Sequence, residues 1–336
     1  MKGLNLVVSL GLLAAAAPAA FGQFGYGLVG QFNLPAGTAA WDVDGQGRAW
    51  ALVGNSVYAE ATPGSGSFGL FGSVPAGTVS MFGGSFIRVN DAGTQVAIGD
   101  GNFNASASVH FVSTAALNAA GPGGAATQSV VSGNFDGTWN GNHFYLTGAG
   151  SDFVPFVSRV DFTDVTGSPV ATRIITNGGG GSGGVAISGG SLFAGVGYGG
   201  GGLSTGDIRV FDLLAADSAP SPVQFSSGVQ AAGGPVLSAW PLAFDGVGRL
   251  LVGGGDGFGG TTDIGYVAVI DLQSGVRQLL SPAGDSVTYG VDFNPVLSQI
   301  YVSEGGVVYR YAVPAPGAVV TLAMAGLAAA RRRRGA

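Results

Sequence analysis

The chain has 336 residues, of which 64 are glycine and none is cysteine. Once Lys2 and the four arginines near the C-terminus are set aside, 8 arginines stand against 19 acidic residues, a net charge of −11. This balance argues against nucleic acid and anionic lipid as ligands, because phosphate binding needs clustered cations. The lack of cysteine excludes disulfides, thiolate zinc sites and thiol nucleophiles.

The chain begins with the pattern of a signal peptide. Lys2 supplies a positive charge and the apolar stretch Leu4 to Ala17 follows it. Ala20 and Gly22 then place small residues at the −3 and −1 positions of a signal-peptidase site. We therefore expect the Sec machinery to export the protein, residues 1–22 to be removed, and Gln23 to become the first mature residue.

The body, residues 23–312, is expected to be all-β. Its runs of Val, Ile, Phe and Tyr are short and bounded by Gly, Asp, Asn or Pro, as in Leu250 to Val252 and Tyr266 to Ile270. No amphipathic helix of about 12 residues is evident. Two glycine-rich stretches, Gly178 to Gly184 and Gly197 to Gly202, lack the lysine and helix of a phosphate-binding loop and are expected to be flexible loops.

A repeated unit of about 45–60 residues runs through this body. In each copy an inner strand ends at a polar turn, a wholly apolar strand follows, and a third strand comes after it. The copies are Leu242–Gly253 with Tyr266–Leu272, Trp41–Leu52 with Ser56–Tyr58, Val89–Gly99 with Val109–Val112, Gly141–Gly148 with Ser158–Phe162, Val185–Gly195 with Ile208–Leu213, and Val291–Val302 with Val307–Tyr311.

Such units have two apolar faces, so one alone is unstable, whereas a closed ring of them buries both faces and removes long free edges. We therefore predict a β-propeller of about six blades. The units resemble the NHL-like and lactonase-like repeats of the broad propeller superfamily. A seventh blade would need Gln23–Phe32 or Val223–Val236 to supply it, and a pair of β-sandwiches is the alternative architecture.

The C-terminal residues 313–336 form a third pattern. The motif Val313-Pro314-Ala315-Pro316-Gly317 precedes an apolar run from Ala318 to Ala330, and Arg331, Arg332, Arg333 and Arg334 follow. At about 1.5 Å per residue this run spans only about 20 Å as a helix, against a hydrocarbon core of about 30 Å, so the expected transmembrane helix is a weak anchor. Four arginines resist transfer across the bilayer and stay cytoplasmic.

This order of proline motif, apolar helix and basic residues resembles the PEP-CTERM sorting tail. The resemblance implies transient anchoring in the inner membrane and processing by an exosortase-type enzyme, with the protein ending at the cell surface or outside the cell. Ala315 stands where that family has glutamate, so the likeness is to a Val-Pro-Ala-Pro-Gly variant. The alternative is a C-terminal anchor that is never cut.

Residues suited to catalysis are few in the body. His110 and His143 are the only imidazoles, and we interpret both as structural strand residues. Asp42 to Gly45 has the oxygen ligands and glycine of a calcium turn, but an Asp-Gly hairpin turn explains it more simply, as it does Asp100 to Asn102 and Asp256-Gly257. We predict no catalytic residue, cofactor or metal site.

Two function classes follow. The first is a non-catalytic cell-surface or extracellular-matrix protein whose propeller face binds a polysaccharide or another protein; the PEP-CTERM resemblance implies an association with extracellular polymers. The alternative is a secreted propeller enzyme, a metal-dependent lactonase or lyase, whose carboxylates would converge on a metal in the central channel. Asp42, Asp91, Asp245 and Asp292 occupy related places in their repeats and test this alternative.

Overall fold

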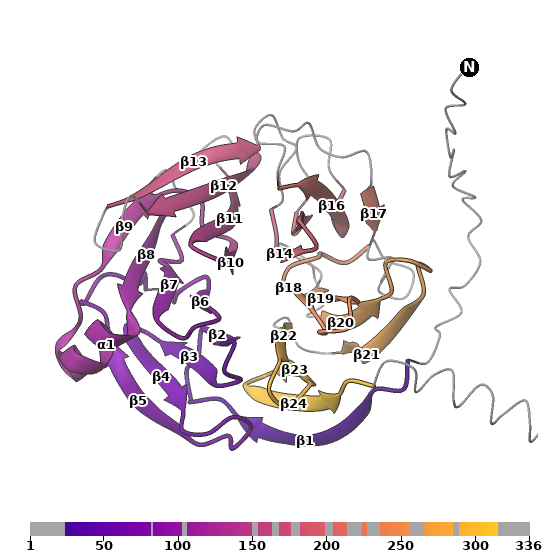
Figure 1. Ribbon diagram of the computed structural model, residues 1–336, viewed down its shortest axis with the longest axis horizontal. Helices are drawn as coiled ribbons and strands as arrows, with labels where there is room; N and C mark the ends of the chain where they lie inside the picture. Colours follow the sequence, from indigo (N-terminus) through magenta and orange to yellow (C-terminus); the bar gives the residue numbers. More distant parts are fainter. Residues whose placement is uncertain are drawn as a thin grey trace, which may run out of the picture.

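The computed structural model describes residues 24–81, 83–102, 106–149, 154–162, 168–175, 182–198, 204–213, 224–226, 236–255, 265–284 and 289–314. Its strands form six four-stranded sheets arranged as a ring around a central axis (Figure 1). Neighbouring strands within each sheet are antiparallel. The predicted six-blade propeller is confirmed, and the pair of β-sandwiches is excluded.

Blades 1 to 3 follow one another along the chain, each running from the axis to the rim. Blade 1 consists of β2 (Ala40–Val43), β3 (Ala49–Val53), β4 (Ser56–Glu60) and β5 (Phe68–Ser73). Blade 2 consists of β6 (Ile87–Val89), β7 (Gln95–Gly99), β8 (Ser108–Ser113) and β9 (Gln128–Val131). Blade 3 consists of β10 (Asp136–Asn140), β11 (His143–Ala149), β12 (Pro155–Phe162) and β13 (Pro169–Ile175).

Blades 4 and 5 repeat the plan, whereas blade 6 combines the two ends of the body. Blade 4 consists of β14 (Val185–Ser188), β15 (Ser191–Gly195), β16 (Asp207–Asp212) and β17 (Gln224–Ser226), and blade 5 of β18 (Leu242–Phe244), β19 (Leu250–Gly255), β20 (Gly265–Ile270) and β21 (Arg277–Gly284). Blade 6 consists of β22 (Tyr289–Asn294), β23 (Gln299–Glu304), β24 (Val307–Ala312) and β1 (Gly27–Asn33).

The ring is closed by the N-terminal strand. β1 pairs antiparallel with β24, so that Gly27 lies opposite Ala312 and Asn33 opposite Val307. β1 therefore supplies the rim strand of blade 6, and Gln224–Ser226 is the rim strand of blade 4. The described strands of Gln23–Phe32 and Val223–Val236 thus belong to blades 6 and 4 and not to a seventh blade.

The second strand of each blade lies in the core between neighbouring sheets, as the apolar runs predict. Trp50, Leu52, Ile98, Leu146 and Val252 are fully buried there. The packing between blades is thus continuous around the ring, with separate clusters joining successive blades. This burial is the main favourable term that stabilises the ring without disulfides.

A short helix interrupts the all-β plan in a place that the sequence did not indicate. α1 (Thr114–Ala120) and the 3-10 turn η1 (Gly121–Gly123) lie between β8 and β9 and pack against β5 of blade 1. Ser113 caps α1, because its hydroxyl accepts a hydrogen bond from the Ala116 N–H at 3.1 Å. Leu117 is fully buried and anchors the helix.

The polar turn of the repeat is held by its own side chain. Asp44 Oδ1 accepts from the N–H groups of Gln46 and Arg48 at 2.9 Å each, and its Oδ2 accepts from the Trp50 indole at 2.9 Å. Asp245 repeats the pattern with Val247 and Arg249. These contacts support the hairpin-turn interpretation of Asp42 to Gly45, while Asp256-Gly257 lies outside the described residues.

The glycine-rich stretches are close-packed where the structure describes them. A Cβ on Gly184 would lie 1.6 Å from the Trp240 carbonyl oxygen, and one on Gly197 would lie 2.5 Å from the Trp240 ring. For residues 182–184 and 197 the prediction of flexible loops is therefore wrong, since glycine there allows blade 4 to approach the strand entering blade 5. Residues 178–181 and 199–202 lie outside the described residues.

This close approach predicts a strong effect of one methyl group. Gly184→Ala should destabilise the fold by about 3 kcal/mol, because the new Cβ meets backbone that cannot turn away. Gly69→Ala on the exposed strand β5, where nothing lies within 4 Å, should change stability by less than about 0.5 kcal/mol. Urea unfolding of both variants measures the difference, and equal midpoints would contradict the packing argument.

The two predicted membrane segments are not covered by the structure. Ala20, Gly22 and Gln23 of the cleavage site, Ala315, Pro316 and Gly317 of the sorting motif, and Arg331, Arg332, Arg333 and Arg334 all lie outside the described residues. Within the described part of the chain, no helix has the length and apolar character needed to span a bilayer. Val313 and Pro314 are described and continue directly from β24.

Candidate functional site

Four charged side chains from the innermost strands of four blades gather at the axis. They are Asp42 on β2, Arg88 on β6, Asp136 on β10 and Asp292 on β22, which we call the axial ion cluster. Arg88 Nη2 lies 2.6 Å from Asp136 Oδ1, and its Nη1 lies 3.1 Å from Asp42 Oδ1. Its Nε also donates to the Gly137 carbonyl at 2.8 Å. One arginine thus connects blade 2 to blades 1 and 3.

Each aspartate of the cluster also binds the backbone of the next blade. The N–H of Val43 donates to Asp292 Oδ2 at 2.8 Å, that of Val89 to Asp42 Oδ2 at 2.6 Å, and that of Val185 to Asp136 Oδ2 at 3.2 Å. The carboxylates therefore join blade 6 to 1, blade 1 to 2 and blade 3 to 4. Their first role is to hold the inner strands in register around the ring.

Burial controls the protonation of this cluster. Burial raises the pKa of Asp42 well above its usual 3.8, Arg88 opposes the rise, and the neighbouring Asp292 carboxylate adds to it. Burial likewise raises the pKa of Asp136 and of Asp292. Burial lowers the pKa of Arg88, but Asp136, Asp42 and Asp292 together raise it above its usual value. Arg88 therefore stays charged, whereas burial favours the neutral form of Asp42.

The raised pKa of Asp42 makes stability depend on pH. A carboxyl whose pKa is higher in the folded than in the unfolded chain stabilises the fold at low pH, and this contribution is lost as pH rises from 3.8 through the folded value. Asp42→Asn keeps the size of the side chain but cannot titrate. We expect the loss of stability between acidic and mildly alkaline pH to be smaller in Asp42→Asn than in the wild type.

Urea unfolding midpoints across this pH range test that expectation. Asp91→Asn is the matched control, because Asp91 is an exposed carboxylate in the turn between β6 and β7. Its pH profile should follow that of the wild type. If the stability of Asp42→Asn depends on pH in the same way as that of the wild type, the pKa of Asp42 is not raised in the fold.

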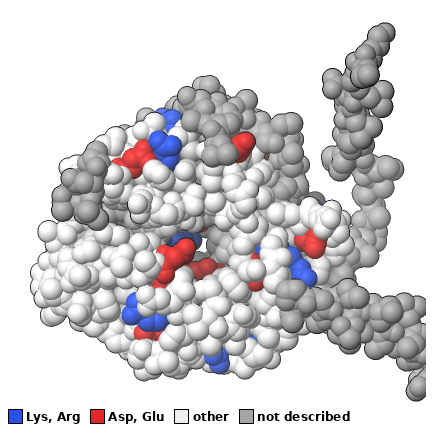
Figure 2. Space-filling view, in the orientation of Figure 1, with Lys and Arg blue, Asp and Glu red and all other residues white. Residues whose placement is uncertain are grey.

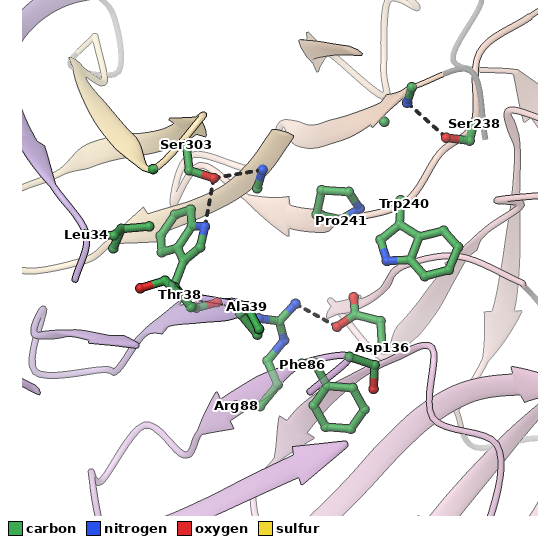
Figure 3. Close-up of a pocket in the computed structure, with 17 residues that line it drawn as sticks. Leu34, Thr38, Ala39, Phe86, Arg88, Asp136, Ser238, Trp240, Pro241 and Ser303 are labelled. Carbon is green, nitrogen blue, oxygen red and sulfur yellow. Dashed lines mark hydrogen bonds and ion pairs between the residues drawn. The ribbon is translucent and has the colours of Figure 1, made fainter. Parts of the chain in front are cut away.

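The axial ion cluster lies between two hollows, and Arg88 lines both. The larger, of about 480 Å³, is lined by Trp41, Trp240, Phe86 and Pro241 together with several serines and glycines. We call it the aromatic pocket. Figure 3 shows Trp240 and Ser303 on opposite sides of it, with the Arg88–Asp136 ion pair between them, and Ser303 accepts from the Trp41 indole.

The smaller hollow, of about 270 Å³, is acidic. Asp42, Asp44, Asp91 and Asp292 line it together with Arg88. Figure 2 shows acidic side chains around the central hollow of the face that it draws. Both carboxylate oxygens of Asp44 accept hydrogen bonds, from the N–H groups of its own turn and from the Trp50 indole. The hairpin turns of the repeat therefore determine the shape of this hollow.

The four aspartates that test the enzyme alternative do not all converge. Asp42 and Asp292 lie at the axis, whereas Asp245 holds a turn and accepts from Tyr26 Oη at 2.6 Å, and Asp91 is exposed in a turn. The sequence did not single out Arg88 or Asp136, which complete the cluster. Among the described residues, no three His, Asp or Glu side chains are placed to share a metal ion.

Both histidines have partners in the strands where the sequence places them. His110 Nδ1 lies 3.1 Å from the Thr127 hydroxyl, and burial lowers the pKa of His110. His143 Nδ1 lies 2.6 Å from Asp161 Oδ1 on the outside of blade 3. Neither ring lines the aromatic pocket or the acidic hollow.

Comparison with known proteins supports the architecture. No family model matches the sequence, and no curated protein matches it significantly. Among solved structures, the β-propeller domain of Cps50 (Swd1) from Myceliophteria thermophila is similar with a TM-score of 0.52 and 10% identity, over 86% of this chain and 100% of that domain. A chain of the mitotic checkpoint complex is similar with a TM-score of 0.51 and 11% identity, over 93% and 99%. The likeness is one of fold.

Proposed function

We propose that the protein is an exported, non-catalytic binding protein of the cell surface or extracellular matrix, sorted through its C-terminal tail, whose propeller binds a polysaccharide or protein in the aromatic pocket. The pocket carries this proposal. Its volume and its mixture of aromatic walls with a few polar groups are typical of ligand sites, which measure about 300–1,000 Å³. The charged side chains among its described lining residues, Arg88 and Asp136, bind each other.

The ion pair at the floor argues for binding rather than catalysis. A general acid or base needs a proton-exchanging group within hydrogen-bond reach of the substrate. Asp136 already accepts from Arg88 and from the Val185 N–H, and Arg88 stays protonated. The comparison with propellers from assemblies such as the mitotic checkpoint complex is consistent with a binding role.

The placement of the chain ends is compatible with two processing steps. β1 begins at Gly27, so cleavage before Gln23 removes none of the described strands. Phe24, Tyr26 and Val313 belong to one cluster beside blades 5 and 6, and a Cβ on Gly25 would lie 3.7 Å from Pro314. Both ends therefore leave the ring at one place, where a Sec-dependent N-terminal cleavage and an exosortase-type C-terminal cleavage would leave the ring intact.

Mass spectrometry of the protein from its native envelope tests export and sorting. We expect a mature form that begins at Gln23 and ends near Pro316. An intact C-terminus that retains the four arginines would reject the sorting proposal and favour a permanent anchor. A retained N-terminus would reject cleavage by signal peptidase.

The alternative, a metal-dependent lactonase or lyase, retains one supporting observation, the Asp42–Asp292 pair at the axis. If these carboxylates held a calcium ion, adding calcium would raise the melting temperature of the purified body. Because the Arg88 guanidinium already lies among the carboxylates, we expect no shift. A clear shift that disappears in Asp292→Asn would favour the enzyme.

A further inference from the structure

We propose that the aromatic pocket binds the uncharged end of a saccharide chain, rather than the middle of one. This assignment rests on the proposed binding function and narrows its ligand. It follows from three properties of the pocket: its closed shape, the hydrogen-bond donors that it leaves free, and its lack of uncompensated charge. Each property comes from named contacts of the described residues.

The pocket is a funnel and not a groove. Its lining comes from five of the six blades, including Trp41 of blade 1, Phe86 of blade 2, Asp136 of blade 3, Trp240 at the entry to blade 5 and Ser303 of blade 6. The described walls therefore stand on five sides of the axis, and Arg88 and Asp136 of the axial ion cluster form the floor. A chain crossing the pocket would need two openings in these walls, whereas a chain end needs only the mouth.

The free polar groups of the pocket are mainly donors. Ser303 Oγ accepts from the Trp41 indole at 2.8 Å and from the Gly290 N–H at 2.9 Å, which leaves its own hydrogen without an acceptor in the described part of the chain. Ser238 Oγ accepts from the Gly255 N–H at 2.9 Å and is in the same situation.

Such donors select a ligand rich in acceptor oxygens. A buried hydroxyl without a partner costs free energy, so a ligand oxygen that satisfies it gains the difference. Arg88 Nη2 adds a further donor, because only one of its two hydrogens has an acceptor among the described residues, Asp136 Oδ1. The hydroxyl and ring oxygens of a saccharide supply acceptors in several directions at once.

The charge and the shape of the pocket narrow the class of ligand further. An anion would approach the Asp136 carboxylate and a cation would approach the Arg88 guanidinium, so a neutral ligand avoids both penalties. Trp41 is fixed by its bond to Ser303, and Trp240 is fixed by edge-to-face packing on Phe135 at 5.6 Å. Two rigid aromatic rings offer apolar contact to the C–H faces of a sugar ring at little cost in conformational entropy.

Calorimetric titration of the mature protein tests the assignment. The probes are neutral linear oligosaccharides of glucose, galactose, mannose and N-acetylglucosamine, with a cyclodextrin as the control, because it contains glucose rings but no chain end. We expect at least one linear series to bind at millimolar concentration or below, and the cyclodextrin not to bind. For that series, affinity should stop rising once the chain is longer than the pocket is deep.

Ser238→Ala is the informative variant. The Ser238 hydroxyl lines the pocket and its own hydrogen has no acceptor in the described structure, so its removal should weaken binding of the linear probe roughly threefold to tenfold. A thermal melt checks that the variant is folded at the assay temperature, because the Gly255 N–H also loses its acceptor. Ser67→Ala is the matched control, since Ser67 is exposed in the loop between β4 and β5. It should bind as the wild type does.

Each other outcome overturns the assignment. Failure of every linear saccharide to bind, equal binding of the cyclodextrin, or full affinity in Ser238→Ala would each reject it. The wider proposal, that the propeller is a binding protein, is judged by a separate result. If no saccharide binds but a purified protein partner is retained by the wild type and lost in Trp240→Phe, the propeller is a binding protein whose ligand is a polypeptide.

Discussion

Replacing Arg88 by methionine should destabilise the propeller by about 3–5 kcal/mol at neutral pH, the cost of breaking a buried ion pair from one side. Arg88 is the only cation among three buried carboxyl groups, and it contacts Asp42 and Asp136 directly. Methionine fills a similar volume but leaves these carboxyls uncompensated. Urea unfolding at fixed pH measures the loss.

The pH dependence of the stability loss in Arg88→Met shows whether the loss comes from the missing charge or from changed packing. At acidic pH the carboxyls take up protons and need no partner, so the destabilisation by Arg88→Met should shrink. Arg159→Met is the control, because Arg159 also pairs with an aspartate but the two side chains are 34% and 33% exposed, and it should cost about 0–1 kcal/mol. Equal losses in the two variants would show that the axial ion cluster contributes no more than a surface pair.

The architecture could be predicted from sequence in those blades whose repeat shows an aspartate turn followed by an apolar strand. Asp44 and Asp245 hold identical turns, and the apolar strands behind them, including Leu52 and Val252, are fully buried. The signature is absent from β10, where Asp136 and Gly137 stand in a polar stretch that suggests a turn. Rim strands such as β9 are also weakly patterned, since one edge faces solvent.

The axial ion cluster could be only half predicted, and the reason is physical. Asp42 and Asp292 follow the repeat, so comparison of the copies identifies them. Arg88 takes the same place in its own copy, but a single arginine in a short strand suggests a surface residue. It is placed at the axis by partners on blades 1 and 3, and such contacts arise only when the ring closes.

The second large loss of stability is expected at Phe32 on β1, the strand that closes the ring. The phenyl ring of Phe32 is buried between the two ends of the circle, 5.9 Å from Phe68 of blade 1 and 5.5 Å from Tyr301 of blade 6. Phe32→Ala removes both aromatic contacts and leaves a cavity at the junction that joins the first blade to the last. We expect a loss of about 3–5 kcal/mol in urea unfolding.

Val29 provides the control on the same strand, because its side chain is 50% exposed. Val29→Ala should change stability by less than about 0.5 kcal/mol, since the backbone pairing of β1 with β24 is kept and little burial is lost. If Phe32→Ala is as mild as Val29→Ala, then β1 is held by its backbone hydrogen bonds alone. The side chains at the junction of blades 6 and 1 would then not be what closes the ring.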